Sequence, residues 1–202
     1  MARTARAEKA AETRGRILAA TARMVAGHGI RGLRVEDVAK EAGIAVSLIY
    51  YHFKSRGGLV QAVLLRTNEL ALAGLAETPV RQLDGRAQLS ALLEGEFSEL
   101  PEVRELAVVW SEATASAAFD PALVPLVREA ARNWEDTVSR LIRTGLADGS
   151  VAPGTDPAGS AARLTALVEG LSSKWLASVL GRAEAIALLR SAMARELGPP
   201  PP

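Results

Sequence analysis

The sequence predicts an all-α protein of about nine helices, with an N-terminal three-helix domain and a larger C-terminal helical domain. Ala, Leu, Arg and Glu, which favour helices, dominate the composition. Apolar residues recur at spacings of three and four, as on one face of a helix. No segment shows the sustained alternation of β-branched residues that indicates a strand, so no sheet is expected.

The first ten residues are basic and carry no apolar stripe, so we interpret residues 1–10 as a mobile arm. A first helix is expected over about 12–27, ended by the glycines at 27 and 29, because glycine suits the left-handed turn after a helix. The apolar face of this helix consists of Ile17, Ala20, Thr21, Met24 and Val25.

Two short helices, at about 35–42 and 46–53, flank Gly43, and a longer one at about 56–76 can be capped by Ser55. Pro101, Pro121 and Pro157 lie near the starts of three of the later helices, where the missing N–H of proline costs little. These later helices are expected at about 86–99, 101–117, 121–148, 157–180 and 182–197.

The charge is unevenly divided, although the whole chain carries a formal charge of only +1. Residues 1–66 hold 12 basic and 5 acidic side chains, a formal charge of +7, whereas residues 67–202 carry −6. Such asymmetry favours a basic N-terminal part that meets an anion, because neutralised phosphates supply most sequence-independent affinity for nucleic acid.

Composition argues against several other classes of protein. No cysteine is present, and the two histidines, His28 and His52, do not have metal-site spacing, so neither metal nor cofactor is expected. No signal sequence or membrane span is visible, which makes the cytoplasm the expected location. The one dense group of carboxylates is spread around a helix like a solvated face and does not suggest an enzyme: Glu94, Glu96, Glu99 and Glu102.

Residues 35–53, VEDVAKEAGIAVSLIYYHF, have the spacing of a helix-turn-helix unit. Val38, Ala39 and Ala42 face the first helix, and Gly43 permits a tight reversal. An ordinary three-helix bundle shows the same spacing, so the basic charge of this region is what favours DNA. A helix of this kind places its N-terminal residues at base edges in the major groove.

These residues resemble the TetR family of bacterial transcriptional regulators. The match includes Arg16-Ile17-Leu18 in the first helix, residues 35–44 around the turn, and residues 49–56, IYYHFKSR. The segment 162–175 also resembles the C-terminal domain of one large branch of the family. The resemblance implies a helix-turn-helix domain at 11–56, a ligand-binding and dimerisation domain at 57–197, and a disordered tail at 198–202.

The resemblance also implies which residues meet DNA. Four match groove-facing positions, and four others match positions that usually reach phosphates. Arg34 stands where the family usually has a Ser or Thr cap, and Ala45 replaces a second capping residue. The predicted DNA-binding residues are Arg34, Val35, Val46, Ser47, Leu48, Tyr50, Tyr51, His52, Lys54 and Arg56.

Aromatic and threonine side chains on apolar faces of residues 86–148 are candidates for an effector cavity, since small-molecule sites are mostly apolar with a few polar groups. Aromatic residues at helical spacing are also ordinary core, and that alternative stays open. The predicted ligand-binding residues are Phe97, Trp110, Thr114, Phe119, Trp134 and Thr137.

The last two helices are apolar on more than one face, which suits a four-helix interface between two subunits. The alternative is that they close the core of a monomer. The predicted interface residues are Leu164, Leu167, Leu171, Trp175, Ile186, Leu189 and Met193.

The sequence as a whole therefore predicts a dimeric transcriptional regulator, most simply a repressor, that binds a palindromic operator. A small, largely apolar effector is expected to release it from double-stranded DNA. The alternative is a helical small-molecule-binding or interaction protein without operator-specific DNA binding.

Overall fold

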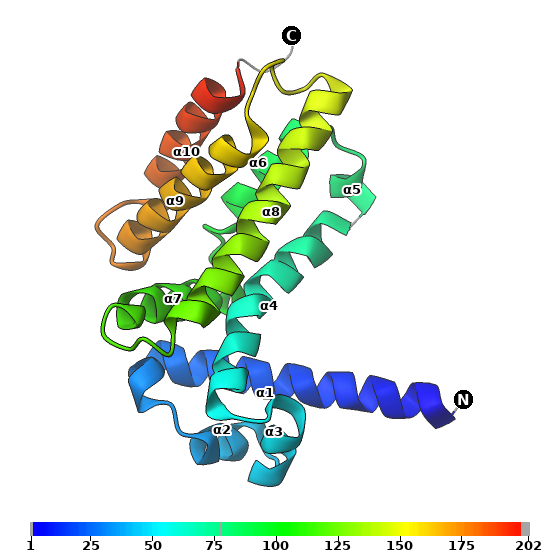
Figure 1. The fold of residues 1–202 in the computed structure, drawn as a ribbon, viewed down its shortest axis with the longest axis vertical. Coiled ribbons are helices and arrows are strands. Elements are labelled where there is room, and N and C mark those ends of the chain that lie inside the picture. The colour runs from blue at the N-terminus through cyan, green and yellow to red at the C-terminus, as the bar shows by residue number, and fades with distance from the viewer. Residues whose placement is uncertain (1, 77, 199–202) are drawn as a thin grey trace. The chain divides into compact units, whose positions relative to one another are not determined.

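The computed structural model describes residues 2–76 and 78–198, and every regular element within these ranges is a helix (Figure 1). The all-α prediction is therefore confirmed for the described residues. The elements are α1 (Ala2–Gly32), α2 (Val35–Ala42), α3 (Val46–Phe53), α4 (Arg56–Ala76), α5 (Thr78–Arg81), α6 (Gly85–Gly95), α7 (Pro101–Ala117), α8 (Val124–Asp148), α9 (Pro157–Leu176) and α10 (Arg182–Leu197).

The chain divides into two compact units whose boundaries fall inside α4, α7 and α8. One unit, which we call the head, comprises residues up to 66 together with 108–128, and the C-terminal unit comprises 67–107 together with the residues from 129 onward. The first unit holds 13 basic and 7 acidic side chains, a formal charge of +6, and the second holds 11 and 16, a charge of −5. The charge asymmetry seen along the sequence is thus also a property of the two folded units.

Helix α1 begins at Ala2, whereas the sequence predicted a mobile arm over residues 1–10. The difference has a local cause, because residues 2–10 contain four alanines among Arg, Glu and Lys, all good helix formers. Near its end the helix is kinked at Gly29, which has φ 73° and ψ 164°. The predicted ending at glycine is thus found as a kink, followed by one further turn.

Helices α2 and α3 form the predicted helix-turn-helix against α1. Gly43 ends α2 in the left-handed conformation, with φ 64°, which is strained for a residue with a side chain. Its N–H donates to carbonyl oxygens of the last turn of the helix. On the predicted face of α1, Met24 is half-buried and Ile17, Ala20, Thr21 and Val25 are buried, and Leu18, outside that face, is buried as well. The inward residues of α2 and α3 are also buried: Val38, Ala39, Ala42, Ile49 and Phe53.

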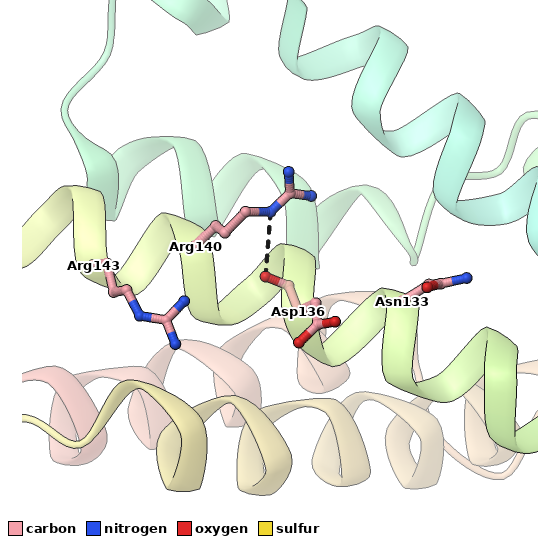
Figure 2. A pocket seen from close by; sticks show the side chains of 4 residues that line it. All are labelled: Asn133, Asp136, Arg140 and Arg143. Carbon is pink, nitrogen blue, oxygen red and sulfur yellow. Dashed lines mark hydrogen bonds between the residues drawn. The ribbon is translucent and has the colours of Figure 1, made fainter.

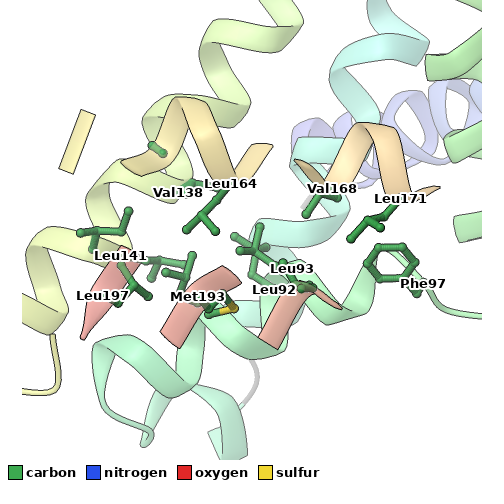
Figure 3. Packing of buried hydrophobic residues seen from close by; sticks show 14 of the residues in the cluster. Leu92, Leu93, Phe97, Val138, Leu141, Leu164, Val168, Leu171, Met193 and Leu197 are labelled. Carbon is green, nitrogen blue, oxygen red and sulfur yellow. The ribbon is translucent and has the colours of Figure 1, made fainter. Parts of the chain in front are cut away.

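The core of the C-terminal unit lies between α6, α8, α9 and α10 (Figure 3). Leu92 and Leu93 of α6 pack there with Val138 of α8, Leu164 of α9 and Met193 of α10. One apolar stripe from each of the four helices is enough to enclose this core. Its largest fully buried side chains include Phe97, Leu89, Leu93, Ile142, Leu164, Leu189 and Leu197.

Several helix ends differ from the predicted ones. The short α5 was not predicted, although Pro79 is its second residue, where a missing N–H costs little. Helix α8 begins at Val124 rather than near 121, and α9 ends at Leu176 because Ser178 adopts φ 59°. Of the predicted disordered tail, residues 199–202 lie outside the described residues. Nowhere in the described ranges is a helix long and apolar enough to cross a membrane.

Candidate functional site

Helix α3 presents one polar and aromatic face outward. Ser47 and Lys54 are exposed, Tyr50 is 44% exposed and Tyr51 is 67% exposed. Val46, Leu48 and His52 are half-buried at the edges of this face. The opposite face, with Ile49 and Phe53, packs into the core, so the polar and aromatic side chains of α3 are directed toward solvent.

Lys54 and Tyr51 are arranged together at the end of α3. The ammonium group of Lys54 donates a hydrogen bond to the carbonyl oxygen of Tyr51 at 3.0 Å and lies 5.5 Å from the centre of the Tyr51 ring. Lys54 has φ 64°, so it turns the chain as well as carrying the charge. Tyr51 also packs edge-on against His52, with ring centroids 5.3 Å apart. These contacts fix the direction of a positive charge beside an exposed phenol.

The N-termini of α2 and α3 carry no side-chain cap within the described residues. Arg34 and Ala45 occupy the capping positions in extended conformations, and neither side chain accepts a bond from the helix. The first N–H groups of both helices therefore keep their positive partial charge, which suits a phosphate oxygen. Arg34 is exposed and adds a full positive charge at one of these ends.

Two predicted DNA contacts are placed differently. The Val35 side chain is only 4% exposed and belongs to the core of the head, so a DNA contact by this side chain is not favoured. The Arg56 guanidinium donates to the carbonyl oxygen of Leu33 at 3.0 Å and to that of Ile30. Arg56 is thus engaged inside the protein, and its predicted phosphate contact is not favoured by this geometry.

Sequence reasoning missed a structural role of Arg16. Its guanidinium donates to the carbonyl oxygen of Ala42, the last residue of α2, at 2.5 Å. The bond holds the end of α2 against α1 just before the Gly43 turn. The sequence shows a basic residue directly before the apolar face of the first helix. Which atom that residue contacts is decided by the fold and has no local signal.

The six predicted effector contacts are not gathered in one unit. Phe97 is fully buried beside Trp175 at a ring distance of 6.0 Å, and Thr137 is buried with its hydroxyl bonded to the carbonyl oxygen of Asn133. Both are core residues, because they fall on the inward faces of their segments. The prediction that they line a ligand cavity is therefore not supported.

Two other predicted effector contacts face outward. Phe119 is 77% exposed, with the Arg31 guanidinium 5.6 Å above its ring, and Thr114 is exposed. Trp110 and Trp134 are half-buried, and Trp134 packs against the core of the C-terminal unit. The two tryptophans are therefore the remaining candidates from the predicted set.

A polar hollow of about 410 Å³ lies along α8, where the sequence predicted a mainly apolar cavity (Figure 2). It is lined by Asn133, Asp136, Arg140 and Arg143. Arg140 donates to the Thr137 hydroxyl at 3.0 Å and to the Asp136 carbonyl oxygen at 3.4 Å. Arg140 and Arg143 leave the helix in different directions in Figure 2, so they do not converge on one anion.

Most of the predicted dimer contacts are core residues of a single subunit. Leu164, Leu171, Trp175, Leu189 and Met193 are buried within the chain's own C-terminal core, which does not favour their assignment to an intersubunit interface. Leu167 and Ile186 are half-buried and pack against that core. The cause is that both helices carry two apolar faces, and the face with the larger side chains turned inward.

The outward faces of α9 and α10 are built from small residues. On α9 the exposed positions recur at spacings of three and four, and α10 shows a similar row that includes Leu188, 46% exposed. We call these residues the small-residue face: Ala162, Ala166, Gly170 and Ser173 of α9 and its C-cap Ala177, with Ala183, Ala187, Leu188, Ser191 and Ala194 of α10.

Comparison with known families identifies both parts of the chain. Residues 17–63 match the model of bacterial regulatory proteins of the tetR family, and residues 85–198 match the C-terminal model of BetI-type transcriptional repressors. The first match includes α2, α3 and the kinked end of α1, and the second includes α6 to α10.

Individual relatives agree with these matches. The HTH-type transcriptional regulator BetI of Cronobacter sakazakii is 27% identical over 83% of this chain and 79% of its own length. A structure described as a TetR-family transcriptional regulator from Rhodococcus sp. is 37% identical, with a TM-score of 0.86, over 93% of this chain and all of that one. A transcriptional regulator from Saccharomonospora viridis in complex with choline is 27% identical, with a TM-score of 0.72, over 93% and 98% of the two chains.

These matched proteins are transcriptional regulators and not enzymes. The exposed face of α3 and the positive charge of the head fit DNA binding, and the two family models together match most of the chain. The chain belongs to the TetR family of DNA-binding transcriptional regulators, with a BetI-type C-terminal domain.

Proposed function

We propose that this regulator is a repressor that binds a palindromic operator as a homodimer and leaves it when a small effector binds. The observation that carries the proposal is the exposed face of α3 on a unit with a formal charge of +6. Phosphate neutralisation by that charge supplies affinity, and side chains on α3 supply sequence preference.

Base reading on α3 rests on a few side chains. Ser47 and Tyr51 carry hydroxyls that donate to and accept from base edges. Val46 and Leu48 are half-buried and offer only apolar contact, which suits the methyl group of thymine. Phosphates on either side are met by Lys54, by Arg34 and Tyr50, and by the uncapped helix N-termini.

The small-residue face is the surface proposed for the second subunit. Small side chains let helices of two subunits approach closely, and Leu188 adds an exposed apolar group. A two-fold dimer uses the same surface on both copies and places two α3 helices about one DNA turn apart, ~34–36 Å, or somewhat more. The operator is then a palindrome with two half-sites.

The proposed effector is small and largely apolar, and Trp134, which packs against the core of the C-terminal unit, is a candidate contact. The relative from Saccharomonospora viridis is in complex with choline, a small cation with three methyl groups. Choline is therefore the first effector to test. The dimer is expected to have two arrangements of its heads, only one of which fits the operator. An effector that binds the other arrangement more tightly lowers the affinity for DNA, and the size of the effect is set by the difference between its affinities for the two arrangements.

Fluorescence anisotropy with labelled DNA from upstream of the gene tests the repressor proposal. We expect tight binding to one palindromic fragment, steep salt dependence and competition only by DNA that contains both half-sites. Equal affinity for scrambled DNA of the same length would contradict operator recognition and favour a binding protein without sequence preference. Addition of choline to the preformed complex then measures effector release directly.

A further inference from the structure

The backbone of Ile30 is held at both ends by helices that continue into the other unit. Its N–H donates to the Glu112 carboxylate of α7 at 3.3 Å, and its carbonyl oxygen accepts from the Arg56 guanidinium at the start of α4. The Ile30 side chain is also fully buried. One residue is therefore fixed by three independent contacts.

The Glu112 carboxylate fits against the kink of α1. The positive φ of Gly29 favours a glycine, and a Cβ atom there would lie 2.9 Å from Glu112 Oε1, so a side chain at this position would displace the carboxylate. Ser116, one turn further along α7 and buried, donates its hydroxyl to the same oxygen at 3.3 Å. The acceptor is thus oriented from its own helix as well as by the kink.

The segment held in this way leads directly to the DNA-binding helices. Arg56 also donates a hydrogen bond to the carbonyl oxygen of Leu33, and Leu33 precedes Arg34, the residue at the N-cap of α2. On the other side, Arg31 lies over the Phe119 ring, which follows α7. The position of α2, and with it α3, therefore depends on the contacts that hold segment 29–33.

We propose that Glu112 is a positioning residue for operator binding, resting on the proposed function above. It touches no DNA; it holds segment 29–33 in the arrangement that sets α2 and α3 for the groove. A hydrogen bond to a charged acceptor is among the stronger ones in proteins, and its loss frees the segment at the kink.

The test compares three variants of the full-length protein in operator-binding titrations. Glu112→Ala is expected to weaken operator binding about tenfold, whereas Glu112→Gln keeps an amide oxygen for the Ile30 N–H and retains affinity within about threefold. Glu105→Ala, on the same helix but in the other unit, is the matched control and should bind like the wild type. Equal affinity of Glu112→Ala and wild type, or a loss in Glu112→Gln as large as in Glu112→Ala, overturns the proposal.

Two further readouts separate positioning from direct contact and from general instability. The slope of log affinity against log salt should be unchanged in Glu112→Ala, because no phosphate contact is lost. Amide hydrogen exchange of residues 29–33 should rise in Glu112→Ala, while that of the α6–α10 core stays as in the wild type. A reduced slope or uniformly raised exchange contradicts the assignment. If the wild type shows no operator preference, the proposed function fails, and local exchange still decides whether Glu112 holds the segment.

Discussion

Gly85 and Gly145 bring α6 and α8 together backbone to backbone, since a Cβ on Gly85 would lie 2.2 Å from the backbone nitrogen of Gly145. Beside this contact, the Asp148 carboxylate accepts the Gly85 N–H at 2.7 Å. The hydrogen bonds from Ser150 and from Gly85 lower the pKa of Asp148. The C-terminal end of α8 therefore caps the N-terminal end of α6, and only glycine allows the approach.

Gly85→Ala should destabilise the protein by about 2 kcal/mol or more, because the obstructing atoms are backbone and cannot turn aside. Thermal or denaturant unfolding measures the change. Gly95→Ala is the control, since this exposed glycine at the other end of α6 has no neighbouring atom within 4 Å of an added Cβ. It should be neutral or stabilise by up to ~1 kcal/mol. Similar stability of the two variants would contradict the packing argument.

Lys54→Ala and Arg56→Ala should separate a DNA contact from an internal one. Loss of Lys54 is expected to reduce the salt slope of operator binding by about 0.9 for each bound subunit, since one phosphate contact disappears. Loss of Arg56 removes bonds to Leu33 and Ile30 and should lower affinity and stability without changing that slope. A reduced slope in Arg56→Ala would restore the phosphate role that the sequence suggested.

Ala166→Arg should convert a dimer to a monomer, because a long charged side chain in the middle of the small-residue face prevents close approach. Light scattering during size-exclusion chromatography measures the mass. Ala91→Arg, at an exposed position on α6, is the matched control and should remain dimeric. A monomeric wild type, or a dimeric Ala166→Arg, would place the interface elsewhere or remove it.

The sequence was sufficient for the head because its signals are local. Periodicity, Gly43 and the position of the aromatic residues define α2 and α3 within one or two residues. It was insufficient where two apolar faces compete, as on α9, where Leu164 and Leu171 turned out to be core. It also missed partners distant in sequence, such as Glu112 for Ile30, because a single exposed-looking carboxylate carries no local sign of its acceptor role.

Glu96, at the end of α6, makes the stability of the C-terminal unit depend on pH. Burial raises the pKa of its carboxyl group from 4.5 to about 7. The folded state therefore holds a proton that the unfolded state has already lost between pH 4.5 and 7, so the Glu96 contribution to stability falls as pH rises through that window and levels off above it. Because the side chain is only half-buried, the change in stability is of the order of 1–2 kcal/mol.

Glu96→Gln should remove this contribution. Its unfolding temperature should therefore be higher than that of the wild type at pH 8 but not at pH 4.5. Ser90→Ala provides a nearby comparison on α6 that leaves Glu96 in place. Identical pH profiles for Glu96→Gln and wild type would show that Glu96 ionises in the folded state at an ordinary pKa.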